Sequence, residues 1–292
     1  MTPDLTIVIP TKDRPELLRR AVATARQQTG GPTVEVVVVD DASDEAVSLP
    51  RDAYQRVLRL DRPAGGAGAR NAGTAEARGR FVAYLDDDDE LYPHFASASL
   101  LAHERSRLPG PVGVLSGLEA VDPEGVVLET KRPRASPRGG WYSLEDPLPG
   151  RSFHAKQTLV VETAVLRDVG GWDAGFRSRV HTELFLRLNR VCSLDAIDTT
   201  TYRLLVHPGP RVSKDPELRQ RSFAQLLERH ADAFAARPRG SARLHLDHAE
   251  QSWRDGRRAA ALRATGTALR RAPETTAREL VGRARHRRRE GG

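Results

Sequence analysis

The first part of the chain alternates short apolar runs with polar segments. The apolar runs occupy residues 5–9, 34–39 and 81–85, and a weaker one that includes two arginines occupies 56–60. Runs of this length are typical of strands that are buried on both faces of a sheet. Between them, apolar residues recur at helical spacing over 17–25, and a second helix is predicted over 69–77. Strands that alternate with helices predict an α/β fold with a mostly parallel central sheet flanked by helices.

The pattern is looser beyond residue 110. It predicts strands over 112–117, 125–128 and 158–161, helices over 162–169 and 182–189, and a loop rich in Pro, Gly and Arg over 131–152. A loop of this length is typical of a mobile lid or of a solvated insertion. From residue 216 onward the helical spacing returns, which predicts a C-terminal helical extension. We therefore expect a division into residues 1–110, 111–215 and 216–292.

The composition is that of a globular protein. Of the 292 residues, 39% are hydrophobic, and no apolar run approaches the ~20 residues of a membrane span. The first residues lack the charged and apolar regions of a signal peptide, so we expect a cytoplasmic protein. A single cysteine, Cys192, excludes an internal disulfide and a cysteine-built metal site, in agreement with a reducing compartment.

The net charge of +7 is concentrated at the C-terminal end. Residues 251–292 contain 12 arginines but only four acidic residues. A basic segment of this kind binds anionic lipid or nucleic acid, or is simply solvated. Nucleic acid is the less favoured partner because no aromatic residues are interleaved with the arginines at the C-terminal end.

Four consecutive aspartates, Asp86 to Asp89, directly follow the fourth apolar run. Neighbouring like charges repel one another, so a cationic partner is expected, and a divalent metal ion is the simplest one. Helix capping would explain Asp89 and Glu90. It does not explain Asp86 to Asp88, which therefore indicate a metal or nucleotide role.

Polar clusters follow the first, second and fourth predicted strands. They are residues 11–14, 40–44 and 86–89. In an open parallel sheet, ligands bind at the carboxyl ends of the strands, where such loops converge. The three clusters therefore predict one site.

A series of short motifs runs through the same region. They are IVIPTKDR at residues 7–14, QQT at 27–29, VDDASD at 39–44, GARNAG at 68–73, YLDDDD at 84–89, VGGWD at 169–173 and LFLRL at 184–188. In order and spacing they resemble the motifs of family 2 glycosyltransferases, which have the GT-A fold. The resemblance covers about residues 4–190.

This resemblance implies a sugar transferase, hexosyl or related. It would move a sugar from a nucleotide-diphosphate sugar to a hydroxyl of a glycan or lipid-linked glycan, as in cell-envelope polysaccharide synthesis, with inversion and with Mg²⁺ or Mn²⁺. Residues 1–110 would bind the nucleotide-sugar and residues 111–215 the acceptor. The basic tail would then favour peripheral contact with an anionic membrane at its inner face, although a solvated helix face explains the tail equally well.

The resemblance also assigns site residues. Asp88 would contact the metal, Asp86 and Asp87 would face the ribose or metal-bound water, and Asp89 would cap a helix. The other donor-binding positions are Pro10, Thr11, Asp13, Arg14, Asp41, Arg70 and Asn71. Thr11 and Asp41 would hold the base and ribose, with UDP or dTDP favoured and GDP still open. Arg70 would face a phosphate or form a surface salt bridge.

The sequence departs from the family at the general base. Inverting members usually place a Glu-Asp pair just before the helix of the LFLRL motif, and here Val180 and His181 occupy that place. Either His181 is the base, or Glu183 has taken the role, or catalysis is impaired. A histidine with an ordinary pKa of ~6.5 suits proton transfer near neutral pH. The alternative function is a nucleotide-binding protein of GT-A fold with impaired catalysis.

Overall fold

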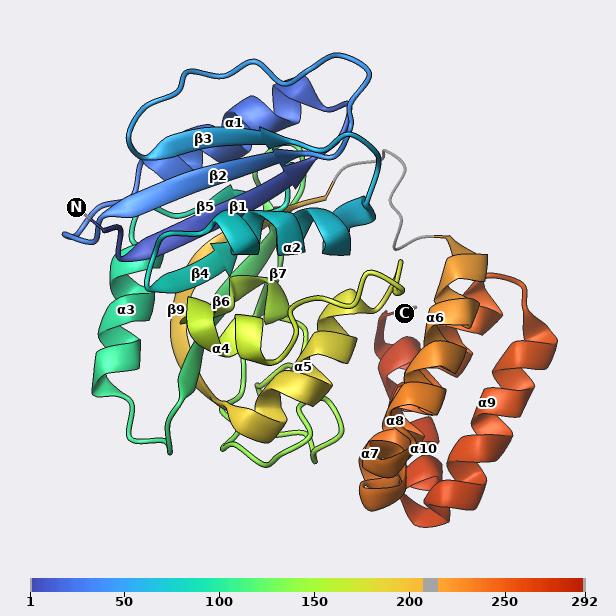
Figure 1. The fold of residues 1–292 in the computed structure, drawn as a ribbon. Coiled ribbons are helices and arrows are strands. Elements are labelled where there is room, and N and C mark those ends of the chain that lie inside the picture. The colour runs from blue at the N-terminus through green and yellow to red at the C-terminus, as the bar shows by residue number, and fades with distance from the viewer. Residues whose placement is uncertain (1, 207–214, 291–292) are drawn as a thin grey trace. The chain divides into compact units, whose positions relative to one another are not determined.

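The computed structural model describes residues 2–206 and 215–290, with side chains up to Arg285 (Figure 1). The chain forms two compact units. One comprises Met1–Gly140 and Pro147–Pro210, and the other comprises Trp141–Asp146 and Arg211–Gly292. The predicted division at residues 110 and 215 stays a prediction.

The first unit is built on a sheet whose N-terminal part is parallel. This part contains β1 (Leu5–Thr11), β2 (Val34–Asp40), β3 (Gln55–Arg59) and β4 (Phe81–Tyr84). The strands lie in the order β3-β2-β1-β4, and each neighbouring pair is parallel. All four predicted strands are confirmed. Their carboxyl ends lie at one edge of the sheet, where the three polar clusters follow.

Beyond β4 the sheet is mixed. It continues in the order β8-β6-β9-β5, and β7 pairs with β6. The strands are β5 (Glu90–Leu91), β6 (Val112–Val121), β7 (Val127–Lys131), β8 (Val160–Glu162) and β9 (Ser193–Leu205). β9 runs parallel to β6, whereas β8 is antiparallel to both β4 and β6. The sequence pattern missed β9, because its polar residues at 195 and 198–201 interrupt any apolar run.

Helices flank this sheet, so the α/β prediction is confirmed (Figure 1). They are α1 (Pro15–Arg26), α2 (Gly65–Glu76), α3 (Phe95–Arg105), α4 (Thr163–Asp168) and α5 (Val180–Val191). α1 buries Leu18, Ala21, Val22 and Ala25, the residues at helical spacing in the sequence. α2 begins at Gly65, four residues before the predicted start, since the glycine-rich loop forms its first turn.

The second unit consists of helices, as predicted. They are α6 (Pro216–Arg229), α7 (Ala231–Ala236), α8 (Pro238–Arg254), α9 (Arg258–Arg271) and α10 (Pro273–Glu290). Part of the predicted 131–152 loop is anchored here: Arg243 donates to the Glu145 carbonyl (3.1 Å) and to the Asp146 carboxylate (2.7 Å). A Cβ at Gly240 would lie 1.8 Å from the Leu144 carbonyl oxygen, so only glycine allows this close contact. Across residues 2–206 and 215–290, none of the helices combines the length and hydropathy needed for a membrane span.

Candidate functional site

The three polar clusters meet at the carboxyl edge of the parallel strands, as predicted. Thr11, the last residue of β1, donates its hydroxyl proton to Asp87 Oδ2 at 2.7 Å. The Asp41 amide, just after β2, donates to the Thr11 carbonyl at 2.9 Å. Asp87 itself lies in the loop after β4. One hydrogen-bonded chain therefore connects the ends of β2, β1 and β4.

The loops after β1 and β2 are joined to each other. The Asp13 amide donates to Ser43 Oγ at 3.0 Å, and the Asp44 amide donates to Asp13 Oδ1 at 2.7 Å. Asp13 and Ala42 have φ angles of 54° and 56°, so both loops turn through left-handed residues. Beside them lies a pocket of about 350 Å³ lined by Asp13, Arg14, Pro15, Leu18, Arg19 and residues 43–49. Pro10 belongs to β1 and is partly exposed at the edge of the site.

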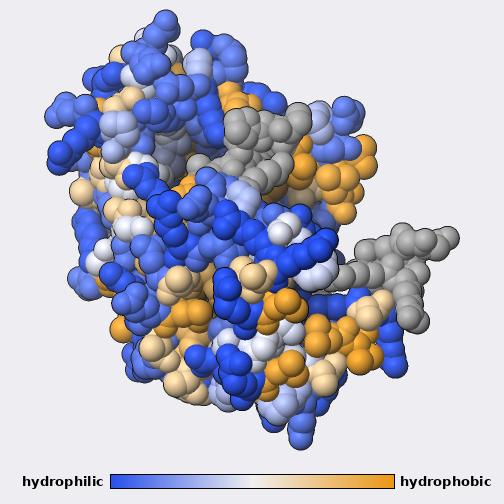
Figure 2. Space-filling view, turned by 90° about the vertical axis from the view of Figure 1, so that its right-hand side faces the viewer, coloured by the Kyte–Doolittle hydropathy of each residue, from blue (hydrophilic) through white to orange (hydrophobic). Residues whose placement is uncertain are grey.

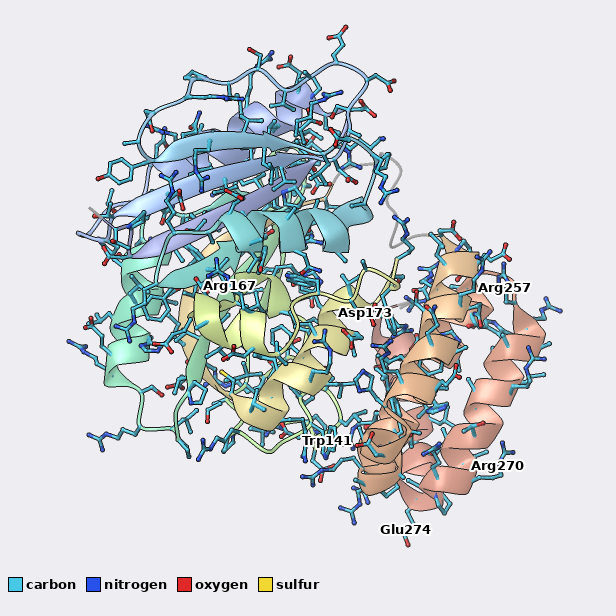
Figure 3. The ribbon with its side chains drawn as sticks, viewed as in Figure 1. Trp141, Arg167, Asp173, Arg257, Arg270 and Glu274 are labelled. Atoms are coloured by element: carbon cyan, nitrogen blue, oxygen red, sulfur yellow. The ribbon has the colours of Figure 1, made fainter. Side chains whose placement is uncertain are left out.

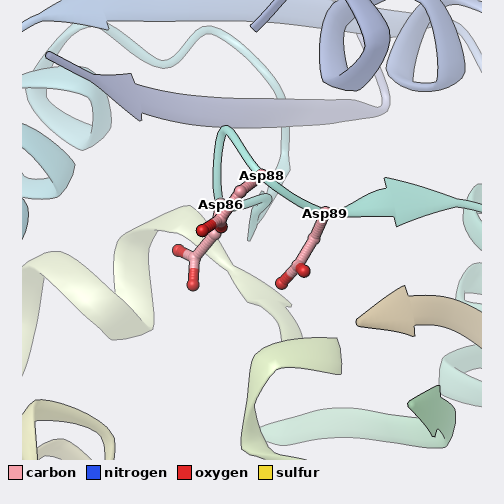
Figure 4. A group of neighbouring side chains, drawn as sticks. All are labelled: Asp86, Asp88 and Asp89. Atoms are coloured by element: carbon pink, nitrogen blue, oxygen red, sulfur yellow. The ribbon is translucent and has the colours of Figure 1, made fainter. Parts of the chain in front are cut away.

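The aspartate run divides into two groups. One oxygen from each of Asp86, Asp88 and Asp89 lies within 4.8 Å of the others, and Figure 4 shows these three side chains together in the loop after β4. Asp87 instead accepts from Thr11 and from Arg14, whose Nη1 lies 3.2 Å from Asp87 Oδ1. The same Arg14 nitrogen lies 3.2 Å from Asp88 Oδ2. Arg14 therefore links the two groups.

The prediction that Asp89 caps a helix is wrong. Its Oδ2 accepts from the Tyr202 hydroxyl at 2.8 Å, and its Oδ1 accepts from the Leu205 amide at 2.9 Å. The next helix, α3, starts only at Phe95 and has His94 at its N-cap. Asp89 is buried and fastens the aspartate loop to β9. The sequence did not reveal this partner because β9 lies more than a hundred residues away.

The surroundings shift the pKa values of Asp86, Asp87 and Asp89 in different directions. Burial raises the pKa of Asp87 to about 6 against the hydrogen bond from Thr11 and the charge of Arg14. Burial, followed by the charges of Asp86 and Asp88, raises the pKa of Asp89 well above its usual value. Burial would also raise the pKa of Asp86, but Arg70 together with His181 and Arg14 outweighs burial and holds this pKa below the ordinary value. A bound cation favours all of the ionised forms.

Trp172 organises the neighbouring side of the site. Its ring lies 5.0 Å from the Tyr84 ring and 4.9 Å from the His181 ring, in both cases edge to face. The Arg70 guanidinium carbon lies 5.0 Å from the centroid of the Trp172 ring, and Nη2 of Arg70 donates to Asp86. Trp172 thereby brings the predicted phosphate ligand and the predicted base to one place. The VGGWD motif was the sequence signal for this residue, but its central position was not predicted.

Asn71 and Asp41 use their side chains to hold the backbone. Asn71 Nδ2 donates to the Trp172 carbonyl at 2.7 Å, and the Trp172 amide donates to Asn71 Oδ1 at 2.8 Å. Asp41 accepts from the amides of Ala64 and Gly65 at 2.6 and 2.8 Å, at the start of α2. Such carboxylates satisfy helix N–H groups that have no partner within the helix. Nucleotide contacts by Asn71 and Asp41 stay predictions.

His181 lies close enough to Arg70, Asp86 and Lys156 for their charges to act on it. Burial, then Arg70 and Lys156, lower the pKa of His181 to about 3, although Asp86 acts in the other direction. His181 is therefore a neutral imidazole near pH 7. Burial and the charge of Arg179 lower the pKa of Lys156 to about 7, and Lys156 Nζ donates to the Phe153 carbonyl at 2.6 Å. The sequence analysis did not single out Lys156, although it is one of only four lysines.

Glu183, the alternative base, forms a buried ion pair with Arg187. Arg187 Nε donates to Glu183 Oε1 at 2.7 Å, and Nη2 donates to Oε2 at 2.6 Å. Arg187 also donates to the carbonyls of Val169 and Gly171 at 2.6 and 2.8 Å. Glu183 is fully buried. The pair therefore holds the turn that leads into Trp172, which indicates a positioning role for Glu183.

We expect Glu183→Gln to destabilise the first unit by about 3–5 kcal/mol, since Arg187 would lose its buried carboxylate. Thermal unfolding measures this loss. The control is Glu217→Gln on α6, whose 3.5 Å pair with Arg221 is exposed and is expected to contribute less than about 1 kcal/mol. If Glu183→Gln keeps the wild-type stability but loses all turnover, Glu183 is the base and not a positioning residue.

The donor set fits a hard divalent cation. Mg²⁺ and Mn²⁺ prefer carboxylate oxygens, and Mg²⁺ commonly takes one or two of them together with phosphate and water. Both Asp89 oxygens already accept protein hydrogen bonds. Asp86 and Asp88 are thus the residues of this cluster that would hold the ion.

Comparison with known proteins places this site in a family. Residues 6–113 match the sequence profile described as Glycosyl transferase family 2. This region belongs to the family 2 glycosyltransferases. The matched segment ends after β4 and α3 and contains the whole aspartate run, so the family predicted from the motifs is confirmed.

Two relatives match this chain in part of its sequence. The succinoglycan biosynthesis protein ExoO of Rhizobium meliloti (strain 1021) is 39% identical over 127 residues, covering 42% of this chain and 35% of its own. The GalNAc(5)-diNAcBac-PP-undecaprenol beta-1,3-glucosyltransferase of Campylobacter jejuni is 34% identical over 96 residues, covering 30% of this chain and 31% of its own. The chain thus spans about a third of the length of these relatives.

The likeness of fold extends further along the chain. The crystal structure of S. aureus TarS 1-349 in complex with UDP-GlcNAc superposes with a TM-score of 0.62 at 17% identity, covering 94% of this chain and 82% of that one. This likeness concerns the fold, and it includes the GT-A sheet with its flanking helices.

Proposed function

We propose that this protein is a glycosyltransferase that moves a sugar from a nucleotide-diphosphate sugar to a hydroxyl of a glycan or lipid-linked glycan. The observation that carries the proposal is the cluster of Asp86 and Asp88 at the strand edge of a family 2 region, beside Arg70. The relatives named for succinoglycan synthesis and for glucosyl transfer to a lipid-linked glycan support the acceptor class. TarS, which binds UDP-GlcNAc, supports the donor class.

In this proposal, different residues bind the metal ion, the phosphate and the proton of the acceptor. Asp88 and Asp86 would hold Mg²⁺ or Mn²⁺, which as a Lewis acid neutralises charge on the departing diphosphate. Arg70 lies beside Asp86 and supplies a second positive charge for a phosphate. The pocket beside Arg14 is large enough for part of a small ligand. His181, a neutral imidazole against Trp172, would accept the proton of the acceptor hydroxyl as it attacks with inversion.

A second candidate is a nucleotide-binding protein with impaired catalysis. The observation that favours it is His181 in place of the carboxylate that the family usually carries. Both candidates bind a nucleotide with metal, but only the first cleaves the donor.

A thermal-shift panel of UDP, dTDP and GDP, each with and without Mn²⁺, tests donor binding. We expect a rise of several degrees for UDP or dTDP with Mn²⁺, because a ligand at 100 times its Kd adds about 2.7 kcal/mol. Release of the nucleoside diphosphate from the donor sugar then separates the two candidates. No shift with any nucleotide would contradict both, whereas a shift without release would support the impaired protein.

A further inference from the structure

Helices α9 and α10 carry large apolar residues on the outside, whereas Leu246 of α8 is buried in the core of the second unit. Within the second unit, α8 and α9 pack through alanines, among them Ala261, Ala264 and Ala268 on α9. Leu262 and Leu269 of the same helix are 66% and 43% exposed. Burial of a leucine stabilises a fold more than burial of an alanine. If α9 only stabilised the second unit, its leucines would be expected to face the interior. The exposed leucines therefore indicate that this side of α9 contacts another apolar environment.

Two of the exposed leucines lie on the same helix. Leu262 and Leu269 are two helical turns apart and share one side of α9. Leu280 of α10, 41% exposed, lies one turn beyond the buried Thr276, and α10 packs against α9. At the other end, Arg258 at the start of α9 covers the ring of Trp253, which is 54% exposed, with its guanidinium 5.7 Å from the ring centroid. We call these four residues the apolar seam: Trp253, Leu262, Leu269 and Leu280.

Exposed arginines flank the residues of the apolar seam along the sequence, and one of them, Arg254, pairs with Glu250 at 2.9 Å. Within residues 253–285 the exposed ones are Arg254, Arg257, Arg258, Arg263, Arg270, Arg271, Arg278 and Arg285. The acidic residues of that stretch are Asp255, Glu274 and Glu279, and Asp255 is paired with Arg219 at 2.7 Å. Figure 3 labels Arg257 and Arg270 near the two ends of α9, and Figure 2 shows apolar patches among hydrophilic side chains on the face that it presents. The surface is thus both apolar and positively charged.

From this combination we infer that the apolar seam is a docking surface for an anionic lipid bilayer. Leucines and a tryptophan enter the boundary of the acyl chains while arginines remain at the headgroups, as in helices that lie in a membrane interface. A second copy of this surface would meet it with like charge. Nucleic acid would match the arginines but would leave the leucines without an apolar partner. The sequence prediction of membrane contact rested on the 12 arginines of residues 251–292, of which Arg287, Arg288 and Arg289 lie outside the described side chains.

Flotation of the full chain with lipid vesicles tests this inference. The wild type is expected to bind vesicles containing roughly 30 mol % phosphatidylglycerol at least tenfold better than pure phosphatidylcholine vesicles, because each arginine near the surface contributes about a factor of five. A triple variant should bind the anionic vesicles at least about tenfold more weakly than the wild type. It combines Leu262→Gln, Leu269→Gln and Leu280→Gln. Arg263→Gln with Arg270→Gln should have a similar effect that weakens at high salt.

The matched control combines Leu101→Gln, Val127→Gln and Leu148→Gln, three residues of the first unit with 44–49% exposure. It should bind vesicles like the wild type. Equal binding to both kinds of vesicle, or equal loss in the seam and control variants, would overturn the inference. The inference would also be overturned if the wild type bound no vesicles but shifted RNA in a gel, and if the Arg263→Gln, Arg270→Gln variant lost that shift. The nucleotide thermal shift should be intact in every variant, so failure of lipid docking is distinguishable from failure of donor binding.

Discussion

Asp88→Asn is expected to lower the rate of metal-dependent sugar transfer by at least about 10²-fold. A metal ion that neutralises the departing diphosphate contributes several kcal/mol to transition-state stabilisation, and each 1.36 kcal/mol is a factor of ten in rate. The fold should survive this change. The charge of Asp88 helps to raise the pKa of both Asp87 and Asp89, so its removal relieves repulsion between buried carboxylates. Initial rates with Mn²⁺ and thermal unfolding measure the two effects.

Asp61→Asn provides the control, because Asp61 is an exposed aspartate outside the site. It should keep both the rate and the stability of the wild type. An Asp88→Asn protein that still responds to Mn²⁺, beside an Asp86→Asn protein that does not, would move the main metal contact to Asp86. A marked loss of stability in Asp88→Asn would show that Asp88 serves the fold.

His181→Ala is expected to lower turnover by about 10²–10⁴-fold, the usual contribution of a general base. The tertiary structure changes the expected pH dependence. A histidine with an ordinary pKa would give an acid limb near pH 6–7, but burial and Arg70 lower the pKa of His181 to about 3. The acid limb that His181 gives to kcat/KM should therefore lie near pH 3. Because a bound diphosphate offsets the charge of Arg70, the limb in kcat should lie at higher pH.

Rates of the wild type, His181→Ala and His181→Asn across pH 4–8 test this expectation, because kcat/KM of the wild type should show no acid limb from His181 within that range. His154→Ala is the control, since His154 is an exposed histidine. A limb near pH 6 that remains in His181→Ala belongs to Asp87, whose pKa is about 6, and should disappear in Asp87→Asn. Turnover within threefold of wild type in both His181 variants would exclude it as the base.

Local sequence was sufficient for much of the fold. The runs at 5–9, 34–39 and 81–85 became β1, β2 and β4, which are buried as such runs require, and the weaker run at 56–60 became the less buried β3. The convergence of Thr11, Asp41 and Asp87 also followed from local information, since parallel strands place their carboxyl ends together. The Glu183–Arg187 pair could have been predicted as well, because residues four apart on a helix face each other.

Contacts between distant segments were not predictable in this way. β9 has polar residues at its centre and is a strand only because β6 and β5 offer hydrogen bonds on its two sides. The Asn71–Trp172 contact spans 101 residues. No local rule states which backbone an asparagine in a helix will bind.

The sequence by itself determined the family, the α/β architecture and the place of the metal-binding candidates. These depend on the order of motifs and on hydrophobic periodicity, both of which are local properties. Only the tertiary structure decided how each aspartate is used: Asp89 fastens to Tyr202 and Leu205, Asp87 binds Thr11 and Arg14, and Asp86 meets Arg70. It also decided that His181 is neutral near pH 7. The physical reason is that burial and the fields of distant charges set ionisation and hydrogen bonding, and both arise only when the chain has folded.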